Sequence, residues 1–482
     1  MMSRAARVML PLVLVAGLGA APLKAEEPAK NRGATTGAAA SPQGMISLVD
    51  MAPELYFQFR RYPKFYGDPN TTRGDLAQRS QLLGNAGGVR DSLVERGIYF
   101  DVSVTQFLQS NVSGGKESGD ARYNGTADYW LTLDSGKAGL WPGGALFLHA
   151  ESSWQANRSV NRDTGSLLPA NYDATMPTPG VSRGIALPEL YLAQGLPANW
   201  LLILGKVDWA GLGDTNVFAN NERTQFGYTG LVNSPILGAF IPYTSLGVCG
   251  VWQPSREHQL ALLTIQSTGD ATTSGFDNFN GNYTVGGQYQ FSPTLAGGRP
   301  GNYRVLVGYN SKDVTDYAID PRHLIGEIVG AVPVAQKSSN YALILNFDQY
   351  LWVQGGGPVA GRKGLPPVGI GIFGRAGFAP QDRNVIDQAY SLGIGGFGML
   401  IPGRPYDQWG VGWSGTHVSS DVRDDLAVLR QSVQAFEHGF EAFYNFRLTP
   451  ATHLTMNVQA INSPVSSRDS AVTLGARLRL DF

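Results

Sequence analysis

The sequence predicts an all-β protein, a transmembrane antiparallel β-barrel of about 16 strands with a short N-terminal helical segment. Residues 471–482 alternate strictly between apolar and polar side chains and end on an aromatic residue, the period of a strand with two unlike faces. Similar alternating segments recur from residue 98 onward. Charged residues make up 16% of the chain, against roughly 25% in soluble domains, and 61 of the 482 residues are Gly.

The two unlike strand faces favour a barrel in lipid over a soluble β-sandwich. In such a barrel the apolar face meets the hydrocarbon, the polar face lines a watery lumen, and closure leaves no strand edge unpaired. No run of about 18 apolar residues occurs beyond residue 25, so no membrane-spanning helix is predicted. The terminal Phe482 also resembles the C-terminal signature of bacterial outer-membrane barrels.

The N-terminus has the three-part pattern of a secretory signal peptide. Arg4 and Arg7 precede an apolar run over residues 8–21, and the small residue Ala25 stands before two acidic residues. This pattern predicts a cleaved signal peptide over residues 1–25. An amphipathic or buried N-terminal helix is the alternative.

The segment after the signal peptide divides into a linker and a helix. A linker or periplasmic segment is expected over 26–74, because residues 31–43 are rich in Gly, Ala, Ser and Thr. A helix is expected over 75–97, where Gly97 provides a stop signal. The outer-membrane barrel would then occupy residues 98–482.

The alternating segments predict sixteen strands, each near the ~10 residues that a tilted membrane strand needs. They are 98–108, 122–134, 144–155, 187–195, 200–209, 243–252, 258–266, 281–291, 302–311, 341–353, 368–377, 389–400, 408–418, 436–448, 453–462 and 470–482.

The connections between these strands mostly alternate in length, as expected for long external loops and short periplasmic turns. The long ones are 156–186, 210–242, 311–340 and 419–435, and the short ones are 196–199, 253–257, 401–407 and 449–452. The stretch 354–367 is long where a short turn is expected. A strand beside it is therefore open to misassignment.

Several motifs resemble the OprB-type carbohydrate-selective porin family. The first is LLGNAGGVRDSL at residues 82–93, followed by Arg96-Gly97-Ile98. The family usually has an acidic residue and a Trp where this chain has Asn85 and Ala86. Further blocks are FGRAG at 373–377, DRN at 382–384, SLG at 391–393, PGRP at 402–405 and FEAFY at 440–444. The resemblance implies a sugar-conducting porin of the Gram-negative outer membrane.

Parity along each strand assigns polar residues to the lumen if the apolar face meets lipid. On 200–209 this places Leu201, Ile203, Val207 and Trp209 in lipid. The predicted substrate-binding or pore-lining residues are Lys206, Glu151, Arg375, Asp208, Glu189, Arg304, Glu441, Arg447, Arg477 and Arg479. Of these, Lys206, Glu151 and Arg375 are the favoured solute contacts. For each charge, a salt bridge within the wall is the alternative.

Two of the long connections, 156–186 and 210–242, either fold inward as a constriction or extend into solvent. The charges that an inward fold would bring to the pore are Arg158, Arg162, Glu222 and Arg223. Tyr99, Trp130 and Tyr350 either stack on sugar rings or belong to the aromatic girdles at the membrane interfaces.

These observations predict an outer-membrane porin for passive diffusion of glucose-like sugars or polyols, in contact with outer-membrane lipid. A general or anion-preferring porin is the first alternative, since basic residues outnumber acidic ones among the predicted lumen charges. A structural surface barrel and an outer-membrane lipase are the further alternatives.

No catalytic motif, cofactor site or metal site is predicted. The net charge of −1 gives no support for nucleic-acid binding. The channel is expected to act as a homo-trimer or a monomer, and periplasmic sugar-handling proteins are expected partners.

Overall fold

The structure, a computed structural model, describes residues 48, 72, 74–155, 158–176, 184–276, 279–356 and 366–482. The predicted signal peptide over 1–25 lies outside the described residues. So does the predicted linker over 26–74, except at Leu48, Thr72 and Gly74. Leu48 is 2% exposed and belongs to an apolar cluster inside the barrel.

The strands are β1 (Ile98–Ser113), β2 (Ala121–Asp134), β3 (Gly144–Trp154), β4 (Ile185–Leu196), β5 (Trp200–Val207), β6 (Ser245–Trp252), β7 (His258–Gln266), β8 (Tyr283–Phe291), β9 (Thr294–Leu295), β10 (Arg299–Thr315), β11 (Gln336–Val353), β12 (Gly369–Phe378), β13 (Ile386–Phe397), β14 (Gln408–Val418), β15 (Phe436–Thr449), β16 (Thr452–Ile461) and β17 (Ala471–Asp481). Each predicted strand overlaps one of the long strands. The sequence had no signal for β9, which is two residues long and extends a turn beside β10.

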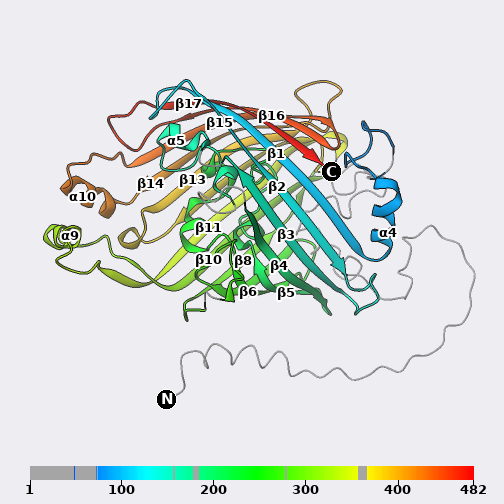
Figure 1. Ribbon diagram of the computed structural model, residues 1–482, viewed down its shortest axis with the longest axis horizontal. Helices are drawn as coiled ribbons and strands as arrows, with labels where there is room; N and C mark the ends of the chain where they lie inside the picture. Colours follow the sequence, from blue (N-terminus) through cyan, green and yellow to red (C-terminus); the bar gives the residue numbers. More distant parts are fainter. Residues whose placement is uncertain are drawn as a thin grey trace, which may run out of the picture.

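The long strands close into one antiparallel barrel (Figure 1). Strand β1 pairs with both β2 and β17, with Ser103 opposite Asp481 and Ile98 opposite Leu133. Strand β10 pairs with β8 across the short β9, and the other long strands pair with their sequence neighbours. The predicted 16-stranded antiparallel barrel is confirmed.

The long stretch 354–367 does not disturb the strand order. Strands β11 and β12 pair directly, with Val353 opposite Gly369. Residues 357–365 of this connection lie outside the described residues. The strands on either side are therefore assigned as predicted.

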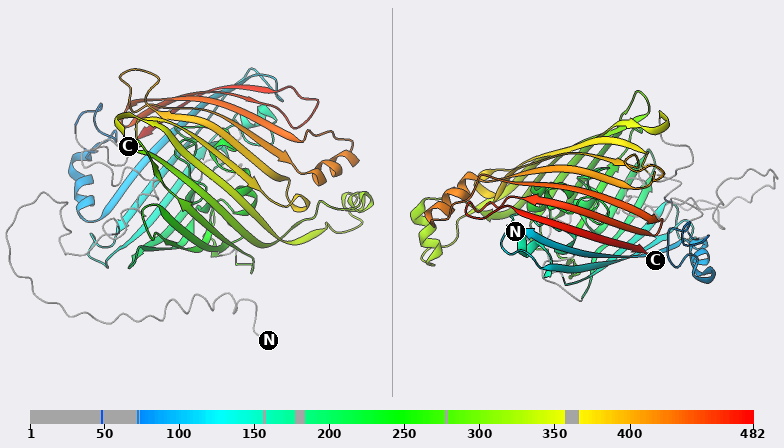
Figure 2. Two further views of the ribbon diagram at one scale, coloured as in Figure 1. Left: turned by 180° about the vertical axis from the view of Figure 1, so that it is seen from behind. Right: turned by 90° about the horizontal axis from the view of Figure 1, so that it is seen from above.

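The helices are η1 (Ala86–Gly88), α4 (Val89–Glu95), α5 (Asn161–Thr164), η3 (Asp173–Thr175), α6 (Trp209–Leu212), α7 (Thr229–Val232), α8 (Pro235–Phe240), α9 (Pro321–Ile328), η5 (Gln354–Gly356), η6 (Gln381–Arg383) and α10 (Ser420–Val428). None of the helices in the described ranges is both long and apolar enough to span a membrane. Helices α9 and α10 lie at the end of the barrel opposite α4 and the C-terminus (Figure 2).

The N-terminal helix is much shorter than the predicted span 75–97. Gly84, Gly87 and Gly88 have φ angles of 53°, 71° and 97°, a left-handed conformation that interrupts a right-handed helix. Regular α-helix therefore begins only at Val89, and residues before Ala86 form turns.

This short helix is fastened to the closing strands. The Arg90 guanidinium donates to the carbonyls of Phe100 at 2.7 Å, Phe482 at 3.1 Å and Gly84 at 3.0 Å. Because Phe100 lies on β1 and Phe482 follows β17, one side chain joins both strands at the closure of the barrel.

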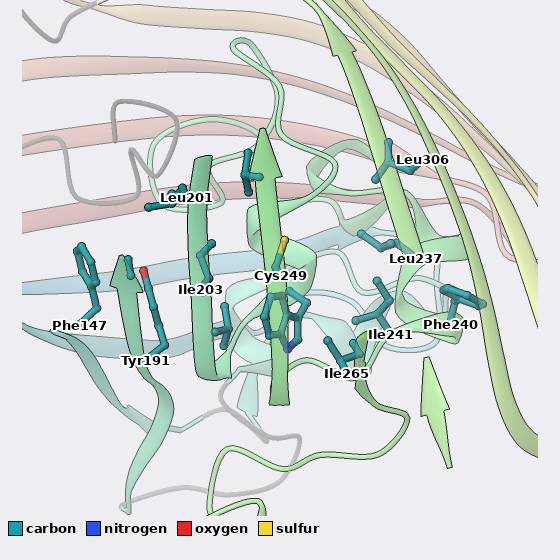
Figure 3. Close-up of a cluster of buried hydrophobic side chains, with 14 of the residues drawn as sticks. Phe147, Tyr191, Leu201, Ile203, Leu237, Phe240, Ile241, Cys249, Ile265 and Leu306 are labelled. Carbon is teal, nitrogen blue, oxygen red and sulfur yellow. The ribbon is translucent and has the colours of Figure 1, made fainter. Parts of the chain in front are cut away.

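Strand β5 reverses the predicted parity. Leu201 and Ile203 are each 1% exposed and belong to an apolar cluster with Leu237 and Ile241 from inside the barrel (Figure 3). Leu204, by contrast, is 43% exposed on the outer face. The prediction that Leu201 and Ile203 face lipid is wrong. Both faces of β5 are apolar, so hydrophobicity alone could not choose between them.

Lys206 follows the outer face of the same strand. Lys206 lies two residues after the exposed Leu204, and the pairing of β5 with β4 continues without a shift between them. Lys206 therefore lies on the same face as Leu204, opposite Leu190 on β4 and Leu246 on β6. Its ammonium group donates to the Thr273 carbonyl at 2.5 Å. This register does not place Lys206 in the lumen, where parity predicted it.

Strand β5 also ends earlier than predicted. Asp208 lies at the N-terminus of α6, where its carboxylate accepts from the Gly211 amide at 2.8 Å. Trp209 is the first residue of that helix and is 2% exposed, and Val207 is fully buried. Both belong to the inner apolar cluster, so the prediction that they face lipid is wrong.

Candidate functional site

The connection between β5 and β6 crosses the lumen. Its helices α7 and α8 contact β10, β11, β12, β13 and β14, which lie on other parts of the wall from β5 and β6. The Asn310 side chain on β10 donates to the Phe240 carbonyl of α8 at 3.0 Å. The connection 210–242 therefore folds inward and does not extend into solvent.

The connection between β3 and β4 meets the first loop inside the barrel. The Tyr172 amide donates to the Gly227 carbonyl at 2.9 Å, and the Thr229 amide donates to the Pro169 carbonyl at 3.0 Å. Arg162, on the same connection, has a side chain that is 67% exposed, and it lies near Glu117. The inner ends of the two loops therefore form a joint constriction, which we call the constriction.

Arg375 on β12 fastens the β5–β6 loop to the wall. Its Nε lies 3.0 Å from an Asp214 carboxylate oxygen. Its terminal nitrogens donate to the carbonyls of Leu231 at 3.0 Å and Ala219 at 2.6 Å. The Arg375 side chain is 2% exposed, so these partners replace water.

Two further charges from β15 and β17 hold the same loop. The Glu441 carboxylate accepts from the amides of Gly227 at 2.9 Å and Tyr228 at 2.8 Å. Arg477 donates to the carbonyls of Glu222 and Gln225. These contacts hold the loop through its backbone, in addition to the side-chain ion pair between Asp214 and Arg375.

Arg223 lies at the centre of a carboxylate cluster. Its guanidinium nitrogens lie 3.0 Å from Asp128, 3.2 Å from Glu151, 3.0 Å from Asp173 and 3.4 Å from Glu222. Asp128, Glu151 and Asp173 are fully or almost fully buried. Burial, the largest effect, raises the pKa of Asp173, which lies on the β3–β4 loop, to about 7.

His149 extends this cluster towards β4. Its ring nitrogens lie 2.9 Å from Asp128 and 3.4 Å from Glu189. Asp128, His149 and Glu151 could offer three metal ligand atoms within 4.8 Å of one another. The Arg223 guanidinium contacts both the Asp128 and the Glu151 carboxylates, so these two groups already have a cationic partner.

A cavity of about 1480 Å³ lies beside the constriction. Among the residues that line it are Arg223, Asn220, Asn221 and Gln225 from the β5–β6 loop. Trp130, which is stacked on the His149 ring at 5.1 Å, also lines the cavity. Its wall therefore combines side-chain amides, paired charges and aromatic rings.

The predicted pore-lining residues fall into three groups. Asp208, Arg304, Arg447 and Arg479 line the cavity. Glu151, Glu189, Arg375, Glu441 and Arg477 are buried in the contacts that hold the loops and the Arg223 cluster. Lys206 lies on the outer face of β5 by register.

Several loop residues at the site were not predicted from the sequence. Asn216, Asn220, Asn221 and Gln225 line the cavity but lie in a connection with no strand periodicity to orient them. The length of that connection and its density of polar side chains were the available signals. Tyr350, considered for sugar stacking, is 1% exposed and packs against Phe218 with ring centroids 4.9 Å apart.

The family model described as "Carbohydrate-selective porin, OprB family" matches residues 187–482. The chain belongs to the OprB family. The match covers more than half of the chain and includes the β5–β6 loop, one of the two loops that form the constriction. The family and the closed barrel together indicate a Gram-negative outer-membrane protein.

The chain is also similar to individual proteins. The Acinetobacter baylyi protein named "Putative porin QuiX" is 23% identical over 452 residues, which cover 84% of this chain and 93% of the relative. The high-pH structure of Pseudomonas putida OprB superposes with a TM-score of 0.72 at 18% identity, covering 85% of this chain and all of the other. The low-pH structure of the same protein gives a TM-score of 0.51 at 16% identity, covering 84% and 99%. The two structures support the fold.

Proposed function

We propose that this OprB-family porin lets small neutral sugars and polyols diffuse passively into the periplasm. The observation that carries the proposal is the lining of the cavity at the constriction. There, amide side chains stand beside arginines that are already paired with carboxylates. Paired charges and amides can exchange hydrogen bonds with sugar hydroxyls without attracting a counter-ion.

Two arginines illustrate this pairing. Arg223 contacts four carboxylates, and Arg304 lies 2.8 Å from Asp348 while its Nε donates to Gln290 at 2.8 Å. Such a wall offers several weak contacts in succession. Conduction requires weak, repeated contacts, because a tightly held solute would block the pore. No cofactor or metal takes part in the proposed function.

An anion-preferring porin is the second candidate. In the described ranges, the cavity is lined by more arginines than acidic residues. The arginines are Arg223, Arg256, Arg304, Arg447 and Arg479, and the acidic residues are Asp208, Glu222 and Asp481. This excess of arginine favours anions where pairing is incomplete.

Liposome swelling distinguishes the two candidates. Liposomes containing the full chain would be placed in glucose or in gluconate, which is similar in size but anionic. We expect glucose to enter at least as fast as gluconate, and empty liposomes to admit neither. Faster entry of gluconate, together with an anion-selective reversal potential in a salt gradient, would replace the sugar proposal with the anion proposal.

A further inference from the structure

The inner wall beside the cavity carries an apolar belt. One row of paired inward-facing residues crosses six strands, namely Leu201, Val251, Ala261, Gln288, Leu306 and Ile344. The neighbouring row runs from Ile203 through Cys249 and Leu263 to Ala342. Within these two rows, which we call the apolar belt, Gln288 is the polar exception.

A polar row borders this belt on the side of the short turns. Gln259 pairs with Gln290, Gln290 pairs with Arg304, and Arg304 pairs with Asn346. All four face inward, and Gln259, Gln290 and Arg304 line the cavity. Successive inward rows on a strand lie roughly 7 Å apart, which is about the width of one sugar ring. A single ring can therefore contact the polar row and the nearer belt row, which runs from Leu201 to Ile344, and a second ring linked to it reaches the row of Leu263.

Helix α8 covers only one part of the belt. At Gly308 on β10, an added Cβ would lie 2.1 Å from the Phe240 ring, so the helix fills that space. At Gly286 on β8, the nearest atom to an added Cβ would be 3.4 Å away. Leu263 on the neighbouring β7, and Cys249 on β6 beyond it, also line the cavity. On β5 and β6 the belt is buried, with Leu201, Ile203, Cys249 and Val251 each at most 5% exposed. On β7 and β8, Ala261, Leu263 and Gly286 are partly exposed and line the cavity, so this part of the belt is accessible to a solute.

This arrangement discriminates between solutes by shape. A ring with one bare hydrocarbon face can lie on the belt while its edge groups bond to the polar row, and burial of that face is favourable. An open-chain polyol displays hydroxyls on all sides and leaves some of them unpaired against the belt.

We propose that the channel prefers ring solutes with one hydrocarbon face and hydrogen-bonding groups at the edge, such as aryl glycosides, over open-chain polyols. This inference rests on the proposed sugar-conducting function and adds a substrate class to it. The specificity-determining residues are those of the accessible belt, with Leu263 at its centre.

Block of single-channel ion current tests the preference. Phenyl β-glucoside, glucose and sorbitol would be added to the full chain in planar bilayers, and the concentration that halves the current would be measured for each. We expect the phenyl glucoside to require the lowest concentration. L263A should raise that concentration roughly fivefold, because the change removes the three outer side-chain carbons that would contact the hydrocarbon face. It should leave the concentration for sorbitol unchanged.

L262A is the matched control. Leu262 is the preceding residue on β7, and it is 58% exposed on the outer face. The same truncation there should change none of the three values. Equal block by all three solutes, or equal effects of L263A and L262A, would overturn the inference while sugar block stands. Block by none of the solutes would instead overturn the proposed function.

Discussion

Removal of the Arg375 side chain should release the constriction loop from the wall. Arg375 makes an ion pair with Asp214 and donates to the carbonyls of Leu231 and Ala219, all within the β5–β6 loop. R375A would leave the fully buried Asp214 without its cationic partner. Undocking of the loop would then become more favourable, because the Asp214 carboxylate could be hydrated once the loop had left the lumen.

The size of this effect follows from burial. Breaking a buried ion pair by removing one partner costs about 3–5 kcal/mol, which raises the undocked population of the loop by a factor of roughly 150 to 4,000. Single-channel recording should show a larger mean conductance and more frequent current fluctuations. The conductance of R375K should lie between those of the wild type and R375A, because a Lys ammonium cannot satisfy three separate acceptors with the Arg geometry.

R383A is the control for this experiment. Arg383 lies in the η6 turn, where it pairs with Asp382 and donates to the Ser339 carbonyl on β11, and neither partner belongs to the constriction loop. Folding of each variant would be checked by heat-modifiable mobility and circular dichroism. If R375A folds as a barrel and conducts like the wild type, Arg375 does not hold the constriction.

Three further predictions concern other parts of the molecule. R90A should lower the free energy of unfolding by about 1–3 kcal/mol, because it removes three hydrogen bonds at the barrel closure; an unchanged midpoint of heat-modifiable mobility would contradict this. E441A should increase conductance as R375A does, and E441Q less so, since a carboxamide oxygen still accepts from the Gly227 amide; equal effects would show that only the charge matters. Asp173 has a pKa of about 7, raised from 3.8 chiefly by burial, so it loses its proton between pH 6 and pH 8; ion preference should shift towards cations across that interval, and D173N should reduce the shift. The same raised pKa means that docking of this loop loses stability as pH rises from about 4 to about 7.

The strand pattern was predictable because most strands have one apolar and one polar face. Arg304, for example, alternates with the exposed Tyr303 and Val305, and parity places it inward as the structure does. Strand β5 was not predictable in this way. Its inner face packs against α8, and a residue such as Ile203 is equally suited to lipid and to that contact.

The roles of the inward charges could not be derived from strand parity. Glu441 and Arg477 face inward as expected, but their partners are backbone groups of a loop that lies more than two hundred residues earlier in the chain. Only the path of that loop shows that these charges position it. The predicted helix over 75–97 was too long because the φ angles of Gly84, Gly87 and Gly88 are set by the turn before Val89.

The most direct test of a sugar channel narrowed by its own loops is current through the purified full chain in a planar bilayer. The account predicts stepwise ion conductance that decreases as glucose is added, because the sugar and the ions share one constriction. Steps that glucose leaves unchanged, or a complete absence of steps from correctly folded protein, would contradict it.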